Sequence, residues 1–380
     1  MSAGTDLFPL GIATGAAHCN RTEERAELSH NIATGTHTWL WGHRRTGKTS
    51  LIEQVLQDLA RTEIAAASVD LLVAHDAQDL EGRLRRAVEG VSARIAPKGR
   101  KASQTLGDAF RALSPEFSVG AMGLKIRLTP PGPPTRGITE MLLGLDRAAG
   151  MVKRQVVLVL DEFQQLCQLS PRTAPRSLEG AIRHAVERSG NVTCVFSGSQ
   201  RRLLAGMFED EERPLYRLCR KITLDRIGGA DYRAFIQGAS RTRWGQPVAD
   251  DVIARVLGLT ARHPYYVNAL CGRLWGGQRS PNVESVETHW SRIVDEEGRV
   301  AAGRLLRRPA SQRAMLKAIA QSEDGVEYPG SHRFLSTLRL PASTGNHARA
   351  ALEHDDLIHR RGDGRWTLVD PVLSSYLRRA

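Results

Sequence analysis

The sequence predicts an α/β domain with a parallel sheet, followed by a helical region and by a small domain of helices and a β-hairpin. Short apolar runs alternate with helical patterns in the first part of the chain, and within these runs apolar and polar residues do not alternate. Such runs are typical of parallel strands that helices cover on both faces. The expected strands are residues 38–41, 65–72, 155–160 and 192–197, with residues 222–224 as a fifth.

The pattern changes twice after the expected sheet. Helical spacing predicts a helical subdomain with helices at residues 231–237, 250–259 and 264–275. A basic stretch at 299–308 is expected to end this subdomain. Beyond it, three more helical patterns precede two short strands that Gly362-Asp363-Gly364 joins, and this is the order of a winged helix-turn-helix. These elements are expected at 311–321, 332–338, 346–354, 357–361 and 365–369. The predicted domains are residues 1–227, 228–308 and 309–380.

Residues 96–136 interrupt the first domain as an insertion rich in Pro, Gly and basic side chains. Within it, residues 117–119 and 123–128 are expected to pair as a hairpin, with a mobile end at 130–134. Residues 83–136 carry 11 basic and 3 acidic side chains, whereas the last 72 residues carry 10 and 8. A net charge of +12 with a local basic segment favours a polyanionic partner; a merely solvated basic surface is the alternative.

The cysteines and the apolar runs exclude several classes of protein. Five cysteines without CxxC spacing predict neither a disulfide framework nor a zinc site. The sequence contains no run of 18 or more apolar residues, which a membrane-spanning helix would need. Its first residues lack the pattern of a signal peptide. We therefore expect reduced thiols, no membrane contact and a cytoplasmic protein.

A motif directly after the first expected strand predicts phosphate binding. Two glycines five residues apart are followed by Lys48 and Thr49, which is the GxxxxGK[ST] spacing of a phosphate-binding loop (P-loop). The loop amides point at the phosphates, Lys48 neutralises the β- and γ-phosphates, and the Thr49 hydroxyl coordinates Mg²⁺. The expected ATP-binding residues are Gly42, His43, Arg44, Arg45, Thr46, Gly47, Lys48, Thr49 and Ser50.

Two acids follow the expected strand at 155–160. Asp161, at the carboxyl end of that strand, is expected to bind Mg²⁺, and Glu162 to orient and deprotonate the attacking water. An ordinary acid pair at a helix N-terminus is the alternative. The phosphate-binding loop 113 residues upstream favours the catalytic interpretation, because hydrolysis needs both parts.

Polar and basic residues near the next two strands are further candidates. Ser197, Ser199 and Gln200 follow the strand at 192–197, and Ser199 is expected to contact the γ-phosphate; a turn that only leaves the sheet is the alternative. Arg217 and Arg220, with Arg213 upstream, precede the fifth strand. They act as arginine fingers across a subunit interface, or they pair with the acids at 209–212.

With these motifs the sequence resembles the archaeal-type ATPase family, in the STAND and AAA+ branch of P-loop NTPases and related to replication-initiator ATPases. The resemblance covers nearly the whole chain and rests on residues 20–28, 42–51, 161–163, 263–266 and 368–372. It implies a three-layer αβα domain followed by a helical lid and a winged helix-turn-helix domain. It also implies that Asn20 and Arg21 lie beside the adenine, and that the lid contributes Arg262, His263 and Pro264.

The chain departs from the family at two positions. Ala261-Arg262 stands where the family usually has Gly-Gly or Gly-Asn. Arg262 therefore either reaches the γ-phosphate as a lid sensor or leaves that contact to His263. The polar residue at the end of the strand at 192–197, which is expected to sense the γ-phosphate, is a serine rather than the Asn usual in AAA+ proteins. Because of this difference we expect slow hydrolysis.

These expectations describe an ATPase switch that uses ATP and Mg²⁺ and forms a homo-oligomer in its ATP state. The winged helix contacts double-stranded DNA, and residues 98–101 of the insertion contribute. The residues expected at the DNA are Asn346, His347, Arg349, Arg360, Arg361 and Arg365.

The sequence also bears on two other functions. Glu353, Asp355 and Asp356 crowd the end of the third helix and oppose duplex binding. A STAND-type signalling ATPase whose winged helix docks a protein effector is therefore the alternative. A catalytically silent scaffold is disfavoured, because the lysine, the threonine and both acids of the nucleotide motifs are present.

Overall fold

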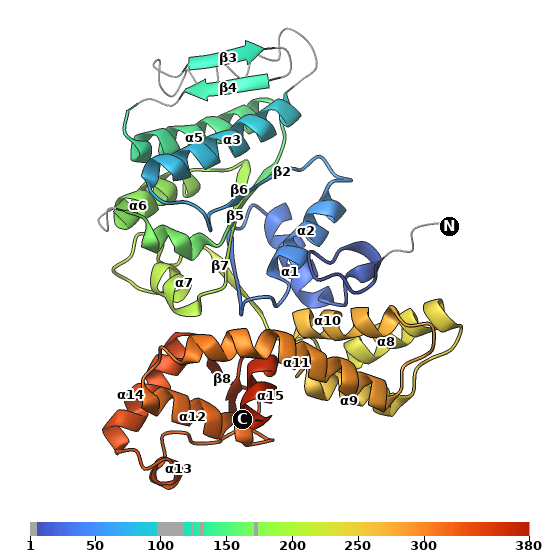
Figure 1. The fold of residues 1–380 in the computed structure, drawn as a ribbon. Coiled ribbons are helices and arrows are strands. Elements are labelled where there is room, and N and C mark those ends of the chain that lie inside the picture. The colour runs from blue at the N-terminus through green and yellow to red at the C-terminus, as the bar shows by residue number, and fades with distance from the viewer. Residues whose placement is uncertain (1–5, 97–117, 123–124, 130–131, 171–173, 380) are drawn as a thin grey trace. The chain divides into compact units, whose positions relative to one another are not determined.

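The computed structural model describes residues 6–96, 118–122, 125–129, 132–170 and 174–379 (Figure 1). Contacts divide these residues into two compact units. We call residues 21–44 and 48–224 the sheet unit, and residues 6–20, 45–47 and 225–379 the C-terminal unit. The lid helices and the winged helix thus form a single unit, which the first residues of the chain join.

The sheet unit contains five parallel strands in the order β2-β5-β6-β1-β7. They are β1 (Thr38–Gly42), β2 (Ala65–Asp70), β5 (Val156–Asp161), β6 (Val192–Gly198) and β7 (Arg220–Leu224). All five predicted strands are confirmed, and β6 lies between the strand of the phosphate-binding loop and the strand of the acids. The three inner strands are buried along nearly their whole length, whereas the outer strands alternate between buried and exposed residues.

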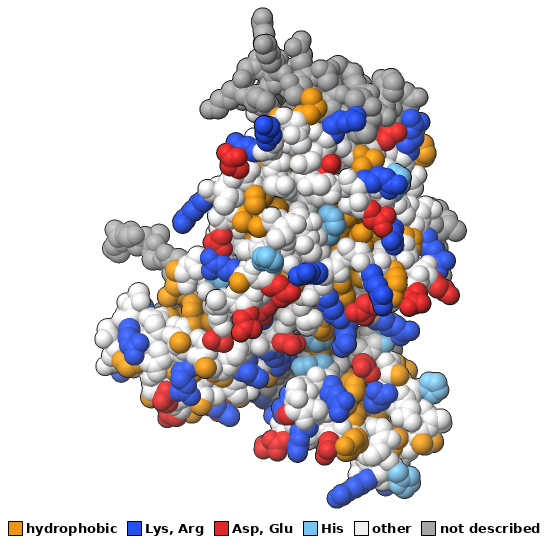
Figure 2. Space-filling view, turned by 180° about the vertical axis from the view of Figure 1, so that it is seen from behind, with side chains coloured by type: hydrophobic (Ala, Val, Ile, Leu, Met, Phe, Trp, Pro, Cys, Tyr) orange, Lys and Arg blue, Asp and Glu red, His pale blue; other side chains and the backbone are white. Residues whose placement is uncertain are grey.

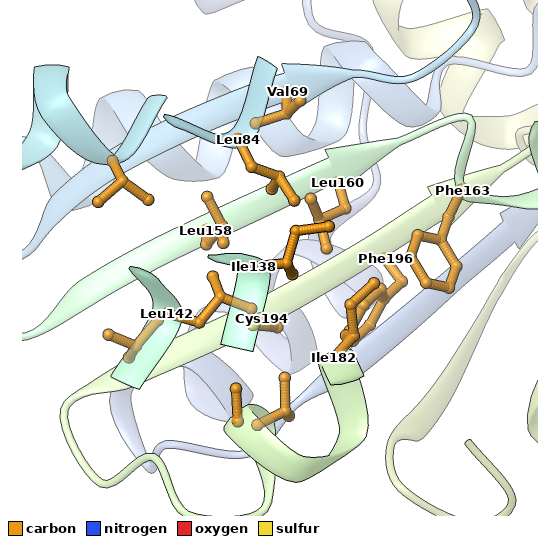
Figure 3. Close-up of a cluster of buried hydrophobic side chains, with 14 of the residues drawn as sticks. Val69, Leu84, Ile138, Leu142, Leu158, Leu160, Phe163, Ile182, Cys194 and Phe196 are labelled. Carbon is orange, nitrogen blue, oxygen red and sulfur yellow. The ribbon is translucent and has the colours of Figure 1, made fainter. Parts of the chain in front are cut away.

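Successive residues of the inner strands point to two different cores. Leu158 and Leu160 of β5 belong to one core, whereas Val157 and Val159 belong to the other. Figure 3 shows the first core, in which Phe163 and Phe196 pack edge to face with ring centroids 4.6 Å apart. Because side chains alternate across a strand, this division requires helices on both faces of the sheet.

Among the described residues, seven helical segments supply that cover. They are α1 (Thr22–Ala33), α2 (Lys48–Leu59), α3 (Ala77–Ile95), α5 (Pro134–Met151), η2 (Phe163–Gln168), α6 (Ala174–Val186) and α7 (Arg201–Phe208). Helices α1 and α2 pack in one core, and α3, α5, α6 and α7 pack in the other. In α3 the apolar positions lie three or four residues apart, and Asp76 caps the first turn by accepting from the Asp79 amide at 2.8 Å. The predicted three-layer αβα fold is confirmed.

A β-hairpin stands where the insertion was predicted. Strands β3 (Ser118–Met122) and β4 (Lys125–Thr129) pair antiparallel, as expected, and β4 packs on α3 (Figure 1). The Leu128 amide donates to Glu89 Oε1 at 2.7 Å. The expected DNA-contacting residues 98–101 lie outside the described residues. The expected mobile end is wrong at Pro134, which begins α5, because proline suits the first turn of a helix.

The lid part of the C-terminal unit is helical, as predicted. It contains η1 (Gly15–Ala17), α8 (Gly229–Trp244), α9 (Asp250–Leu259), α10 (Pro264–Trp275) and α11 (Val283–Leu305). Phe8 packs against Phe235 and Trp275, with ring centroids 5.6 and 4.8 Å away, so the first residues complete this core. The basic stretch expected to close the subdomain falls largely in the last turns of α11, a helix that the sequence patterns did not indicate.

The winged helix-turn-helix contains α12 (Ala310–Gln321), α13 (His332–Thr337), α14 (Ala342–His354), β8 (Ile358–Arg360), β9 (Trp366–Leu368) and α15 (Pro371–Arg379). All predicted elements are present, with shorter strands, and α15 is additional. Helix α15 packs on α11, where Trp290 Nε1 donates to Ser375 Oγ at 3.2 Å. A Cβ on Gly298 of α11 would lie 2.6 Å from the Tyr376 ring, so the two helices approach closely there. This contact joins the winged helix to the lid.

Two expectations about chemistry and location can be compared with the structure. All five cysteines are free thiols, as predicted. No membrane-spanning helix is found among the described residues, since none combines the required length with sufficient apolarity.

Candidate nucleotide-binding site

The predicted phosphate-binding loop connects buried β1 to the first turn of α2, which begins at Lys48. Gly47 has φ 92° and Arg45 has φ 63°, both in the left-handed region. Gly47 adopts this conformation without the steric cost that a side chain adds. The turn places consecutive backbone amides at a helix N-terminus, where the helix dipole also favours an anion.

The Lys48 ammonium lies inside this loop. Its Nζ donates to Gly42 O at 2.8 Å and to His43 O at 3.1 Å, and the residue is only 6% exposed. A buried ammonium requires such hydrogen-bond partners, because an unpaired buried charge costs more free energy than the hydrogen bonds themselves contribute. The positive charge is therefore held at the loop, where it suits a polyphosphate.

Asp161, the last residue of β5, contacts residues of α2 and β6. Thr49 Oγ1, at the start of α2, donates to Asp161 Oδ2 at 3.2 Å, and Ser197 Oγ, near the end of β6, donates to Asp161 Oδ1. The structure thus brings together the two residues expected to hold the metal. Hydroxyl and carboxylate oxygens are the hard ligands that Mg²⁺ prefers, so the donor set fits that ion.

Glu162 follows Asp161 in a left-handed conformation, with φ 51° and ψ 43°. Its backbone amide donates to Asp161 Oδ1 at 2.9 Å. Ser199 Oγ donates to Glu162 Oε2 at 2.9 Å, and Gln164 Nε2 donates to the same oxygen. Left-handed backbone at a residue other than glycine costs about 1 kcal/mol and recurs at functional sites.

Ser199 is a candidate that the sequence indicates, whereas Gln164 is not. The only local sequence signal for Gln164 is that an amide side chain stands two residues after Glu162. That spacing alone has no chemical meaning. Gln200, the other polar candidate, precedes α7 and makes no side-chain capping bond to that helix.

Arg213 and Arg217 precede β7, and Arg220 is its first residue; of these three candidates, Arg213 has an ion-pair partner. Arg213 forms an ion pair with fully buried Glu179 of α6 and donates to Cys167 Sγ at 3.6 Å. The expected alternative, pairing with the acids at 209–212, is therefore wrong for Arg213. Arg217 and Arg220 are exposed, and the Arg217 guanidinium lies 4.9 Å from the Tyr216 ring centroid.

The remaining candidates have unusual backbone conformations. Asn20 and Arg21 have φ 51° and 67°, and Arg21 pairs with Glu24 at 2.8 Å. In the lid, Ala261 and Arg262 have φ 45° and 58° and precede His263, which is 4% exposed. Pro264 begins α10. The roles of these residues toward a nucleotide stay predictions.

The fold was compared with known proteins. No protein-family model and no curated protein sequence matches the chain. Among solved structures, the Walker-type ATPase PABY2304 of Pyrococcus abyssi is similar with a TM-score of 0.72 and 18% identity, over 98% of this chain and 99% of that one. The ORC2 protein of Aeropyrum pernix, in its ADPNP-ADP complexes, has a TM-score of 0.59 and 13% identity over 99% and 96%.

The protein has the P-loop NTPase fold. The similarity extends over the whole chain, so it includes the lid and the winged helix as well as the sheet. At the level of fold, the predicted resemblance to archaeal ATPases and replication initiators is confirmed. In this P-loop fold the groups at the ends of β1, β5 and β6 make direct contacts, as described above.

The ion pair of Arg213 generates a prediction about stability. Replacing Arg213 with Ala leaves the Glu179 carboxylate buried without its partner, and burial already raises the pKa of Glu179. We expect a loss of about 3–5 kcal/mol in the free energy of unfolding of the sheet unit, measured by urea denaturation. Arg217→Ala is the matched control, since Arg217 is exposed. Equal stability of the two variants would refute a structural role for the pair.

Proposed function

We propose that the protein is an ATP-hydrolysing switch, which binds MgATP at the sheet unit and uses its nucleotide state to control a C-terminal DNA-binding module. The observation that carries the proposal is the contact of Thr49 with Asp161, beside the Lys48 ammonium and Glu162. Phosphoanhydride hydrolysis needs a phosphate cradle, metal ligands and a base at one place, and these residues supply all three.

Each group has a distinct part in the proposed reaction. The loop amides and Lys48 bind the phosphates, and Thr49 and Asp161 would hold Mg²⁺, whose charge stabilises the leaving phosphate. Glu162 orients the attacking water and accepts its proton. Ser197 fixes the Asp161 carboxylate, because its hydroxyl donates to Oδ1. We include Arg217 and Arg220 as arginine fingers supplied by a neighbouring subunit, since both are exposed.

The lid is connected to the winged helix through Arg226, at the start of the C-terminal unit. Its guanidinium donates to Ala261 O at 2.6 Å, in the turn that leads to His263, and to Val369 O at 2.7 Å, at the end of the wing. Burial, reinforced by the Arg262 charge, lowers the pKa of Arg226 to about 10, so the group remains protonated at neutral pH. One side chain therefore holds the proposed lid sensor and the wing together.

A second contact joins the same two parts. Tyr266 OH, in α10, donates to Asp370 Oδ2 at 3.1 Å. Asp370 Oδ1 in turn accepts from the amides of Val372 and Leu373 and so caps α15. Both contacts, with the packing of α15 on α11, support a lid that carries the winged helix as it moves.

The helix-turn-helix has a charge distribution that supports DNA as the partner. Residues 328–352, which include α13 and all of α14 except its last two residues, contain three arginines and no acidic residue, although α14 ends on Glu353-His354 and the domain as a whole carries only a small positive charge. Arg333 and Arg339 are exposed, as are Asn346 and His347 near the start of α14. On the face drawn in Figure 2, by contrast, basic and acidic side chains are interspersed. The acid-free segment suits a polyanion.

A protein effector is the second candidate partner, because two expected DNA-contacting arginines are already paired. Arg349 pairs with Glu353 at 3.0 Å, and Arg361 pairs with Asp363, which lowers the pKa of Asp363 to about 2 through hydrogen bonding. Such pairs reduce the charge available to DNA phosphates. The wing is therefore a weaker contributor than the sequence suggested, and α13 and α14 would provide most of a DNA contact.

The nucleotide site is tested first with two variants. Lys48→Ala should abolish ATP binding in isothermal titration, because the loop loses its only ammonium. Glu162→Gln should retain ATP affinity and lower steady-state turnover by about 10²-fold or more, since it removes the general base. Lys153→Ala, an exposed lysine of the same unit, is the control. Unchanged ATP affinity in Lys48→Ala would contradict the loop assignment.

DNA binding is tested with Glu162→Gln protein saturated with ATP. Its affinity for duplex DNA should fall steeply with salt, and replacing Arg333 and Arg339 with Ala should reduce the log–log slope by about 2, one per phosphate contact. Lys317→Ala, at an exposed position of α12, should leave the slope unchanged. If no binding is measurable at about 50 mM salt, a protein effector replaces DNA as the proposed partner.

Coupling is tested at Arg226. Arg226→Met removes both donors while retaining an apolar stem, so we expect ATP turnover to persist and the ratio of DNA affinities in the ATP and ADP states to approach 1. Arg233→Met is the matched control, because Arg233 is exposed and pairs within the lid, with Asp250. A ratio equal to that of the wild type would show that coupling does not pass through Arg226.

A further inference from the structure

Both hydrogen bonds to the Glu162 carboxylate reach the same oxygen. Ser199 Oγ and Gln164 Nε2 donate to Oε2, and no described residue donates to Oε1. The two oxygens of this carboxylate therefore have different environments: one is anchored by the protein, and the other is left to accept from something else.

Gln164 is an unexpected residue at its position. It is 2% exposed in the 3₁₀ helix η2, and its neighbours Phe163 and Leu166 belong to the apolar core. Its amide orientation is determined by chemistry, because a carboxylate only accepts and so must face Nε2. Its Oε1 is then buried without a hydrogen-bond partner among the described residues. Buried polar atoms without partners are rare and require an explanation.

Gly198, at the end of β6, makes room for this amide. A Cβ at Gly198 would overlap Gln164 Oε1, and it would lie 3.1 Å from Gln164 Cδ and 2.8 Å from Leu204 Cδ1. The backbone of Gly198 is not left-handed, so conformation does not require glycine there. The close approaches of the Gln164 amide, which is the nearest neighbour, and of Leu204 do.

We propose that Gln164 is a positioning residue for Glu162 and that Gly198 is glycine in order to accommodate it. Together with Ser199, Gln164 anchors Oε2, so that Oε1 accepts the hydrogen bond from the attacking water and then its proton. The proposal rests on the ATPase function proposed above and extends it to two residues that act through the proposed base. It explains why a buried amide with one unpartnered oxygen is retained beside the proposed base.

The first test replaces Gln164 with Met, which has nearly the same volume and no donor. We expect kcat for ATP to fall about tenfold or more, while KM and the Kd for ATP stay within about twofold, because only the base loses its anchor. Gln165→Met is the matched control: Gln165 is the next residue of η2, and its amide donates to Ala74 O at 3.5 Å rather than to Glu162. Thermal unfolding of both variants reports their folding.

The second test asks whether Gln164 acts through Glu162. In a Glu162→Gln background, Gln164→Met should cause no further loss in single-turnover hydrolysis, since the anchored group is already gone. Gly198→Ala should reproduce the kcat defect alone and add little to Gln164→Met, because its Cβ acts by displacing the amide. Gly206→Ala in α7 is the control, since a Cβ there meets nothing within 4 Å.

The outcomes separate this inference from the proposed function. If the wild type hydrolyses ATP and Gln164→Met has unchanged kcat, the positioning role is refuted and the ATPase function stands. Equal losses in Gln164→Met and Gln165→Met, or additive losses with Glu162→Gln, would also refute it. A wild type that binds ATP without hydrolysing it would overturn the ATPase function and this inference together.

Discussion

The hydrogen bond between Thr49 and Asp161 depends on the order of the strands. The two residues are 112 positions apart and come together because parallel strands end at the same edge of the sheet. Strand β6 lies between their strands, with Leu40 of β1 opposite Ser197 and Leu160 of β5 opposite Phe196. This register puts the Ser197 hydroxyl beside Asp161, so β6 also contributes to the orientation of the carboxylate. A slip of one residue would turn these side chains to the opposite face.

The apolar cores stabilise the sheet and allow unfavourable local features at the edge of the sheet where the site lies. The inner strands are buried on both faces, and the aromatic rings of Phe163 and Phe196 pack directly below the site. Glu162 adopts a left-handed conformation and Gln164 buries an unpartnered oxygen, each of which is unfavourable locally. A fold retains such features when the surrounding packing over-determines them, and they concentrate where chemistry requires a fixed geometry.

The sequence predicted what is encoded locally. The P-loop spacing, the apolar runs of the five strands and the acid that ends β5 can all be recognised within a few residues. The proposed roles of Gln164 and Arg226 could not be predicted: a spacing of two residues between Gln164 and Glu162 has no chemical meaning by itself, and Val369 is 143 positions from Arg226. Helix α15 did carry a local signal, an Asp cap followed by Pro371, but its nine residues are too few for a clear periodicity. Arg213 was misjudged because its partner, Glu179, is distant in sequence and buried.

A nucleotide can move this molecule only through contacts that differ between two states. In the sheet unit, the γ-phosphate and the attacking water would meet Lys48 and Glu162, which lie where the buried strands β1 and β5 end. We place the larger response of the proposed switch in the lid. There the turn at 261–263 is left-handed at two successive residues, and Arg226 holds it to the wing.

The energy that such a switch requires can be stated. To shift an equilibrium between two conformational states from 1:99 to 99:1, ATP must bind one state about 10⁴-fold more tightly than the other. If Arg262 or His263 made the proposed charged contact with the γ-phosphate in one state only, that contact would contribute about 1.5–3 kcal/mol of the difference. One such contact would be insufficient, so the proposed switch would need further contacts, such as the proposed arginine fingers of a neighbouring subunit.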